Sequence, residues 1–65
     1  MSIAKVIEVI AEGNTIQNAV EAAAEDTAKR VRNVRQVNVE NIQAVVEDGR
    51  VVKYRVNAKV TFVVD

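Results

Sequence analysis

The sequence contains no cysteine, no histidine, no tryptophan and no proline, and it has only two glycines. Without cysteine and histidine the chain cannot form a disulfide, a zinc site or a thiol redox centre. These are the devices with which small domains usually compensate for a core that buries only about 60% of the unfolded surface. Partner chains remain as the most economical source of stability. We therefore expect a single domain, covering residues 1–65, that forms an oligomer.

Large apolar side chains are scarce as well. Apolar residues make up 49% of the chain, but Tyr54 and Phe62 are the only aromatic residues and leucine is absent. Fifteen valines and nine alanines supply most of the apolar content. Burial stabilises in proportion to area, at about 25 cal/mol per Å². Such small side chains therefore favour packing against other subunits as well as within one chain.

The charges exclude several classes of partner. Nine basic and nine acidic residues cancel, so no overall field attracts nucleic acid or anionic lipid. No apolar run has the length of a membrane span. Residues 1–10 include Lys5 and Glu8 and lack the apolar core of a signal peptide. We therefore expect a cytoplasmic protein with neither nucleic-acid nor membrane partners.

The residue types needed for nucleophilic catalysis are missing. Ser2 is the only serine, and without histidine or cysteine neither a catalytic triad nor a thiol nucleophile can form. Gly13 and Gly49 are too far apart to build a loop that holds phosphate groups. We therefore expect that the protein is not an enzyme.

The first half of the chain predicts a strand followed by a helix. Residues 3–10 are β-branched and mostly apolar, which is typical of a short strand. Gly13 ends this segment, and either Asn14 or Thr15 caps the helix that follows. Helical spacing continues for about 18 residues, to Asn33. The stripe that it forms consists of Ile16, Ala19, Val20, Ala23, Ala24, Thr27, Ala28 and Val31.

The second half of the chain predicts a long hairpin. The apolar period changes to 2 after Asn33, and its parity shifts near Glu40 and Asn41, which indicates a bulge. Asp48-Gly49 is a typical hairpin turn, and the segment after it alternates without a fault. The fold class is therefore α+β, with β-α-β-β order and a three-stranded antiparallel sheet partly wrapped around one helix.

The last strand is longer than the helix can cover. A strand of about 14 residues spans roughly 45 Å, whereas a helix of about 18 residues spans only ~27 Å. An uncovered, β-rich strand promotes aggregation unless a defined oligomer uses it. The strand thus gives a second reason, independent of chain length, to expect assembly.

This order of elements and several short segments resemble the dodecins, a family of small prokaryotic proteins. The segments are residues 5–10, 31–34, 46–49, 54–56 and 59–62, and the likeness covers essentially the whole chain. The resemblance implies a hollow homododecamer that binds and stores a small molecule. The family's ligand is a flavin, FMN or riboflavin, bound in pairs at two-fold interfaces.

The resemblance assigns three positions to the flavin site, and all three carry substitutions. Gln36 replaces the family's tryptophan, on which the isoalloxazine ring stacks. Arg55 replaces a glutamine that hydrogen-bonds the pyrimidine edge, and Gln43 replaces an arginine that holds the ribityl or phosphate part. Because glutamine lacks the contact area of an indole, we expect flavin binding to be weakened or lost. The chain is thus similar to the branch of the family that lacks the tryptophan.

The alternative function is a flavin-free shell that binds divalent metal ions, calcium or magnesium, or an anionic ligand. Carboxylates are the oxygen ligands that both ions prefer. In an oligomer, a single carboxylate that lies near a three-fold symmetry axis is supplied by three chains. The candidate metal ligands are Glu12, Glu40, Glu47 and Asp48.

The basic residues of the last strand are the candidates for an anion site. Lys53, Arg55 and Lys59 alternate with the apolar positions and share a face with Asn57. This pattern is typical of a solvated face or of ion pairs, and less often of a site for an anion such as phosphate.

Overall fold

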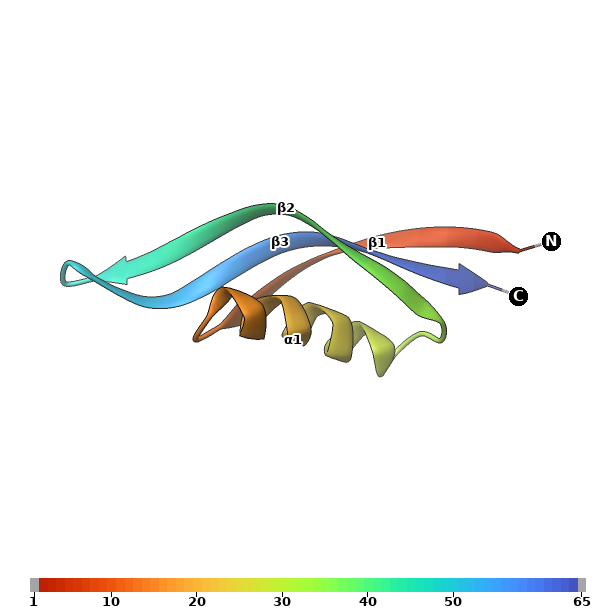
Figure 1. Cartoon of the computed structure of the whole chain (residues 1–65), viewed down its shortest axis with the longest axis horizontal. Helices are drawn as coiled ribbons and strands as arrows, with labels where there is room; N and C mark the ends of the chain where they lie inside the picture. The colour runs from red at the N-terminus through yellow and green to blue at the C-terminus, as the bar shows by residue number, and fades with distance from the viewer. Residues whose placement is uncertain (1, 65) are drawn as a thin grey trace.

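The structure, a computed structural model, describes residues 2–64 and contains three strands and one helix within them. Their order is β1 (Ile3–Gly13), α1 (Ile16–Ala28), β2 (Val34–Glu47) and β3 (Arg50–Val64). The strands form one antiparallel sheet in the order β1-β3-β2, and α1 lies along one side of it (Figure 1). The predicted β-α-β-β architecture is confirmed. The two outermost positions of the predicted domain, 1 and 65, lie outside the described residues.

The two ladders of the sheet differ in regularity. β1 pairs with β3 without interruption, from Ile3 opposite Val64 to Gly13 opposite Tyr54. β1 therefore runs three residues beyond the strand that the sequence predicts. β2 pairs with β3 through three register shifts, and the one between Val39 and Asn41 is the predicted bulge. The other two, between Val34 and Gln36 and between Val45 and Val46, were not predicted. In the last shift the extra residue is Val52 of β3, because Val45 pairs with Lys53 and Val46 with Val51. Val51 and Val52 are both apolar, so the sequence pattern does not reveal this shift.

The turn between β2 and β3 is the predicted one. Asp48 has a φ of 51° and Gly49 a φ of 75°, which are the two positive values that a type I′ turn requires. Glu47 and Arg50 close the hairpin as register partners. The β2–β3 turn lies at one end of the molecule and the two chain ends lie at the other (Figure 1).

The helix is shorter than predicted. It ends at Ala28 rather than at Asn33. The N–H groups of Arg30 and Val31 both donate to the Thr27 carbonyl, at 2.9 and 3.0 Å, and this closes a turn. Asn33 then has a φ of 61°, a left-handed value that asparagine tolerates. Because the apolar spacing continues through this turn, the sequence pattern alone overestimated the length of the helix.

The helix begins at Ile16, and Thr15, one of the two predicted caps, is its N-cap. Thr15 has an extended backbone, and its Oγ1 accepts a hydrogen bond from the Asn18 N–H at 2.9 Å. This bond satisfies one of the N–H groups that the first helical turn leaves without an intrahelical partner.

The core between α1 and the sheet is small. Thr27 is the buried polar residue, and its Oγ1 donates to the Ala23 carbonyl at 2.8 Å. Tyr54 and Phe62 alternate with the residues of β3 that point away from α1, and they are half-buried. Alanine at the contact lets the helix lie close to the strands, but it buries little area. The buried apolar residues are Ala19 and Ala23 on α1 and Val56, Ala58 and Val60 on β3.

Gly13 permits this close approach where the chain passes from β1 to α1. A Cβ at this position would lie 2.6 Å from the Ala19 backbone N and 2.9 Å from the backbone C of Asn18. Because both atoms belong to the backbone of α1, a Gly13→Ala variant must displace the helix. We expect it to lose about 1–3 kcal/mol of unfolding free energy, measured by thermal or urea unfolding.

Gly49 provides the control for this experiment. A Cβ at Gly49 meets nothing within 4 Å, and the residue has a positive φ. Gly49→Asn should therefore change stability little, since asparagine tolerates this conformation. Equal stability of Gly13→Ala and the unmodified protein would contradict the proposed close contact.

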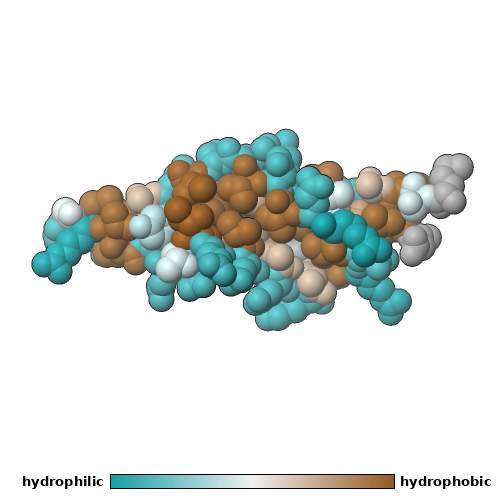
Figure 2. Space-filling view, in the orientation of Figure 1, coloured by the Kyte–Doolittle hydropathy of each residue, from teal (hydrophilic) through white to brown (hydrophobic). Residues whose placement is uncertain are grey.

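The subunit leaves much apolar surface uncovered. It measures 51 × 19 × 14 Å, whereas α1, with 13 residues, covers only about 20 Å of that length. The accessible area is 4801 Å², against about 4,100 Å² for a compact monomer of this mass. Apolar patches are visible along the whole molecule (Figure 2). The exposed large apolar residues are Ile3, Val6, Ile7, Ile10, Ile16, Ile42, Val46, Val51, Val52 and Val64.

Nowhere in residues 2–64 is there a helix that combines the length and the apolar character needed to cross a membrane.

Candidate functional site

The face of the sheet opposite α1 carries all three positions that the sequence assigns to the ligand site. We call it the open face. Val56, Ala58 and Val60 point toward the helix, so the residues that alternate with them on β3 point away from it. These residues and their register partners form rows across the sheet. The rows are Glu12–Arg55–Gln43, Ile10–Asn57–Asn41, Glu8–Lys59–Asn38 and Val6–Thr61–Gln36.

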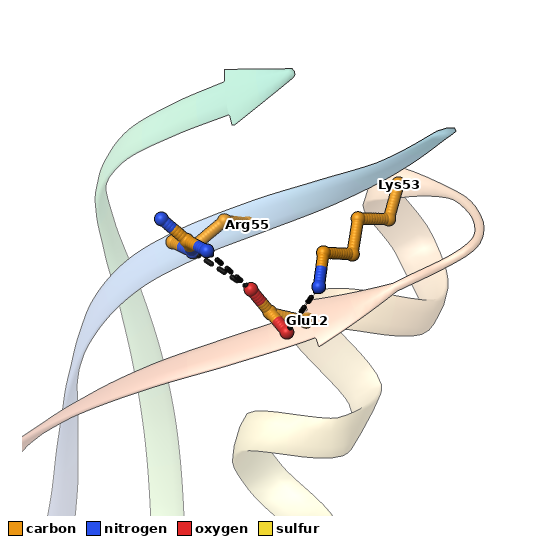
Figure 3. Close-up of polar contacts among 3 residues, drawn as sticks. All are labelled: Glu12, Lys53 and Arg55. Atoms are coloured by element: carbon orange, nitrogen blue, oxygen red, sulfur yellow. Dashed lines mark hydrogen bonds and ion pairs between the residues drawn. The ribbon is translucent and has the colours of Figure 1, made fainter. Parts of the chain in front are cut away.

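A three-residue ion cluster dominates one end of the open face (Figure 3). Glu12, near the end of β1, lies between two cations of β3. Its Oε2 accepts hydrogen bonds from Arg55 Nε at 2.8 Å and from Arg55 Nη2 at 2.6 Å. Its Oε1 accepts one from Lys53 Nζ at 3.1 Å. The antiparallel register produces this contact, because Glu12 and Arg55 are direct partners.

The cluster changes the titration of Glu12. The hydrogen bond from Arg55, and after it the bond from Lys53, holds the pKa of the Glu12 carboxyl below its usual value of 4.5. A carboxyl with a depressed folded-state pKa stabilises the fold above its unfolded pKa, and this stabilisation is lost as the pH falls through the folded value. The cluster is therefore intact at neutral pH. Its three side chains are about 40% exposed (39%, 38% and 41%), so solvent and salt weaken it.

A second ion pair lies toward the other end of the open face. Lys59 Nζ is 3.2 Å from Glu40 Oε1. Asn38 Nδ2 donates to Glu40 Oε2 at 2.9 Å. The bulge between Val39 and Asn41 lets Glu40 reach Lys59 from β2. At both places the cations of the open face are therefore paired with a carboxylate of the same chain, although Glu12 balances only one of the two positive charges beside it.

Between the two ion pairs lies an unsatisfied polar atom. The Oδ1 of Asn57 is buried and has no hydrogen-bond partner among the described residues. Asn57 lies between Ile10 of β1 and Asn41 of β2. A buried acceptor without a partner costs about 1–3 kcal/mol. Because this atom has almost no accessible surface, a donor from another molecule could reach it only if the Asn57 side chain moved.

The three predicted flavin positions do not come together within one chain. Arg55 and Gln43 are register partners. Gln36 lies in the Thr61 row, about 20 Å farther along β3 at 3.3 Å per residue. A site that uses all three positions must therefore combine different chains.

The candidate metal ligands are also dispersed. Glu12 and Glu40 already bind cationic side chains, and Glu47 and Asp48 lie at the hairpin turn. Within residues 2–64 no three carboxylates, or other groups of the metal-binding types, lie close enough to hold an ion. The structure of one chain therefore gives no support to the metal alternative.

Two open hollows lie on the helix side. One, of about 380 Å³, is lined by Val31, Arg32 and Asn33 and by the end of β3. The other, of about 300 Å³, lies between α1 and the last part of β1, with Glu12 and Asp26 on its rim. Neither is lined by Gln36, Gln43 or Arg55, so neither hollow forms the predicted ligand site.

Two features of the open face were not predicted from the sequence. The first is the pairing of Glu12 with Arg55. The sequence had suggested Glu12 as a metal ligand and Arg55 as a residue of the ligand site. The second is the unsatisfied Asn57. The pairing follows from the register of β1 against β3, and no local pattern in the sequence specifies that register.

The comparisons with known proteins agree with the fold. A family model described as Dodecin matches residues 3–65. A Thermus thermophilus protein of known structure is 21% identical, with a TM-score of 0.92, covering 100% of this chain and 97% of that chain. The dodecin from Streptomyces davaonensis is 17% identical, with a TM-score of 0.91, covering 98% of this chain and 96% of that chain. No curated protein sequence matches the chain.

Proposed function

The chain belongs to the dodecin family, and on that premise we propose that it forms a homododecamer that binds and stores a small molecule in the cytoplasm. The observation that carries the proposal is the small core together with the ten large apolar residues that are exposed within residues 2–64, nine of them on the sheet and one on α1. A chain that buries so little apolar area gains its stability from contacts between copies. We further propose that binding, and not catalysis, is its activity.

The ligand that the family suggests is a flavin, and the open face offers it a weakened site. Tyr54 and Phe62 are the only aromatic residues of the chain, and both belong to the alternating set that faces α1. Among the described residues the open face therefore carries no aromatic side chain on which a flavin ring could stack. Gln36 offers an amide in place of an aromatic ring. The site therefore lacks the stabilisation of about 0.5–1.5 kcal/mol that an aromatic pair adds beyond burial.

A Gln36→Trp variant tests this proposal. Because the indole restores a stacking surface, we expect the variant to quench riboflavin fluorescence at a protein concentration at least about tenfold lower than the unmodified protein requires, equivalent to ~1.4 kcal/mol. The measurement is a fluorescence titration at constant riboflavin concentration.

Gln17→Trp is the matched control, since Gln17 is an exposed residue on α1. It adds the same indole away from the open face and should leave quenching at the unmodified level. If Gln36→Trp assembles normally and quenches no better than Gln17→Trp, a flavin site at this position is excluded.

A further inference from the structure

The cations that β3 places on the open face are already occupied by carboxylates of the same chain. We propose that Glu12 acts as a built-in anion that closes Lys53 and Arg55 to anionic ligands, so that the open face accepts neutral polar ligands and rejects phosphate-bearing ones. The proposal concerns ligand selection and rests on the proposed function as a small-molecule binder.

The geometry of the Glu12 cluster is that of a bound anion. The carboxylate takes two donors of the Arg55 guanidinium with one oxygen and the Lys53 ammonium with the other. Guanidinium donors of this kind, with an ammonium beside them, are what a phosphate group uses when a protein binds it. A phosphate-bearing ligand must therefore displace Glu12 before it can reach them.

The covalent connection gives Glu12 an advantage in this competition. Glu12 lies directly opposite Arg55 in an uninterrupted strand ladder, so its carboxylate stays within reach of the two cations. Tethered groups compete at effective concentrations in the millimolar range or above. A free anion at a lower concentration therefore displaces little of Glu12 from the two cations, because the ion pairs that it would form at the surface are individually weak.

The neighbouring residues also favour a neutral ligand. Gln43, on the other side of Arg55, is uncharged. In the next row the Asn57 Oδ1 is a buried acceptor that lacks a donor. Asn57 and its register partner Asn41 are uncharged as well, so neither adds a positive charge that would attract a phosphate group. The open face thus presents uncharged amides between two clusters whose cations are already paired with carboxylates.

Titration with inorganic pyrophosphate in a calorimeter tests the proposal, with the protein in its assembled form. We expect Glu12→Gln to bind pyrophosphate at least tenfold more tightly than the unmodified protein. Glu8→Gln is the matched control, because Glu8 lies on the same strand and the same face but in the Lys59 row. It removes an identical charge and should show no gain. Adding Arg55→Gln to Glu12→Gln should abolish the gain.

A shorter carboxylate gives a second variant. Glu12→Asp keeps the charge but loses one methylene of reach, so it should bind pyrophosphate with intermediate affinity. Absence of pyrophosphate binding by both Glu12 variants would overturn the proposal. So would equal binding by the unmodified protein and Glu12→Gln, or an equal gain in Glu8→Gln. No flavin is involved, so this outcome is independent of the Gln36→Trp experiment.

Discussion

A Val60→Asp variant should fail to fold. Val60 is fully buried between α1 and the sheet, and it is one of five apolar residues in the core. Removing a carboxylate from water without a partner costs several kcal/mol. A chain of this length has only about 3–10 kcal/mol of stability, at ~0.05–0.15 kcal/mol per residue. The cost of the buried charge is therefore comparable with the whole stability of the domain.

Far-ultraviolet circular dichroism measures the result directly. The variant should lack the helix and strand signal of the unmodified protein over the usual concentration range. Asn18→Asp is the control, since it introduces the same side chain at an exposed site in the first turn of α1, where an acid is favourable. A native spectrum for Val60→Asp would mean that Val60 is not in the core.

A Val51→Asp variant is expected to dissociate the assembly. Val51 and Val46 are register partners near the β2–β3 turn and are 51% and 56% exposed. This part of the hairpin projects beyond α1 (Figure 1), so the helix cannot cover it. We expect a neighbouring chain to bury these side chains in the proposed dodecamer, so that a buried, unpaired carboxylate would be repeated in every copy.

Sedimentation velocity distinguishes the outcomes. The unmodified protein should sediment with about twelve times the 7.1 kDa chain mass, and Val51→Asp as a much smaller species. Val51→Ile keeps the site apolar and should remain assembled. If Val51→Asp sediments like the unmodified protein, the hairpin end is not part of an interface between chains.

Local patterns in the sequence were sufficient to predict most of the fold. Asp48-Gly49 identified the hairpin turn, because few other dipeptides adopt two positive φ values. The alternation in β3 identified the face that meets α1, because the side-chain period of a strand is fixed at two. The parity change near Asn41 revealed the bulge for the same reason.

The features that the sequence did not predict depend on parts of the chain that are far apart. The helix ends at Ala28 although helical spacing continues, because Asn33 is held against β3 by a hydrogen bond from the Val63 N–H to its carbonyl. The contact between Glu12 and Arg55 depends on the register between β1 and β3. Each requires knowledge of which distant strand is the partner, and that information does not reside in any one segment.

The strand order has a consequence for how the chain folds as it is made. β3 is central in the sheet, yet it is the last of the three strands in the chain. While the ribosome is still adding residues before Arg50, neither β1 nor β2 has its partner. The β2–β3 hairpin can then close through its local turn, whereas Ile3 must find Val64 across nearly the whole chain, a slow, non-local step. β1, with its exposed isoleucines, is thus the first strand to be synthesised and the last to be paired.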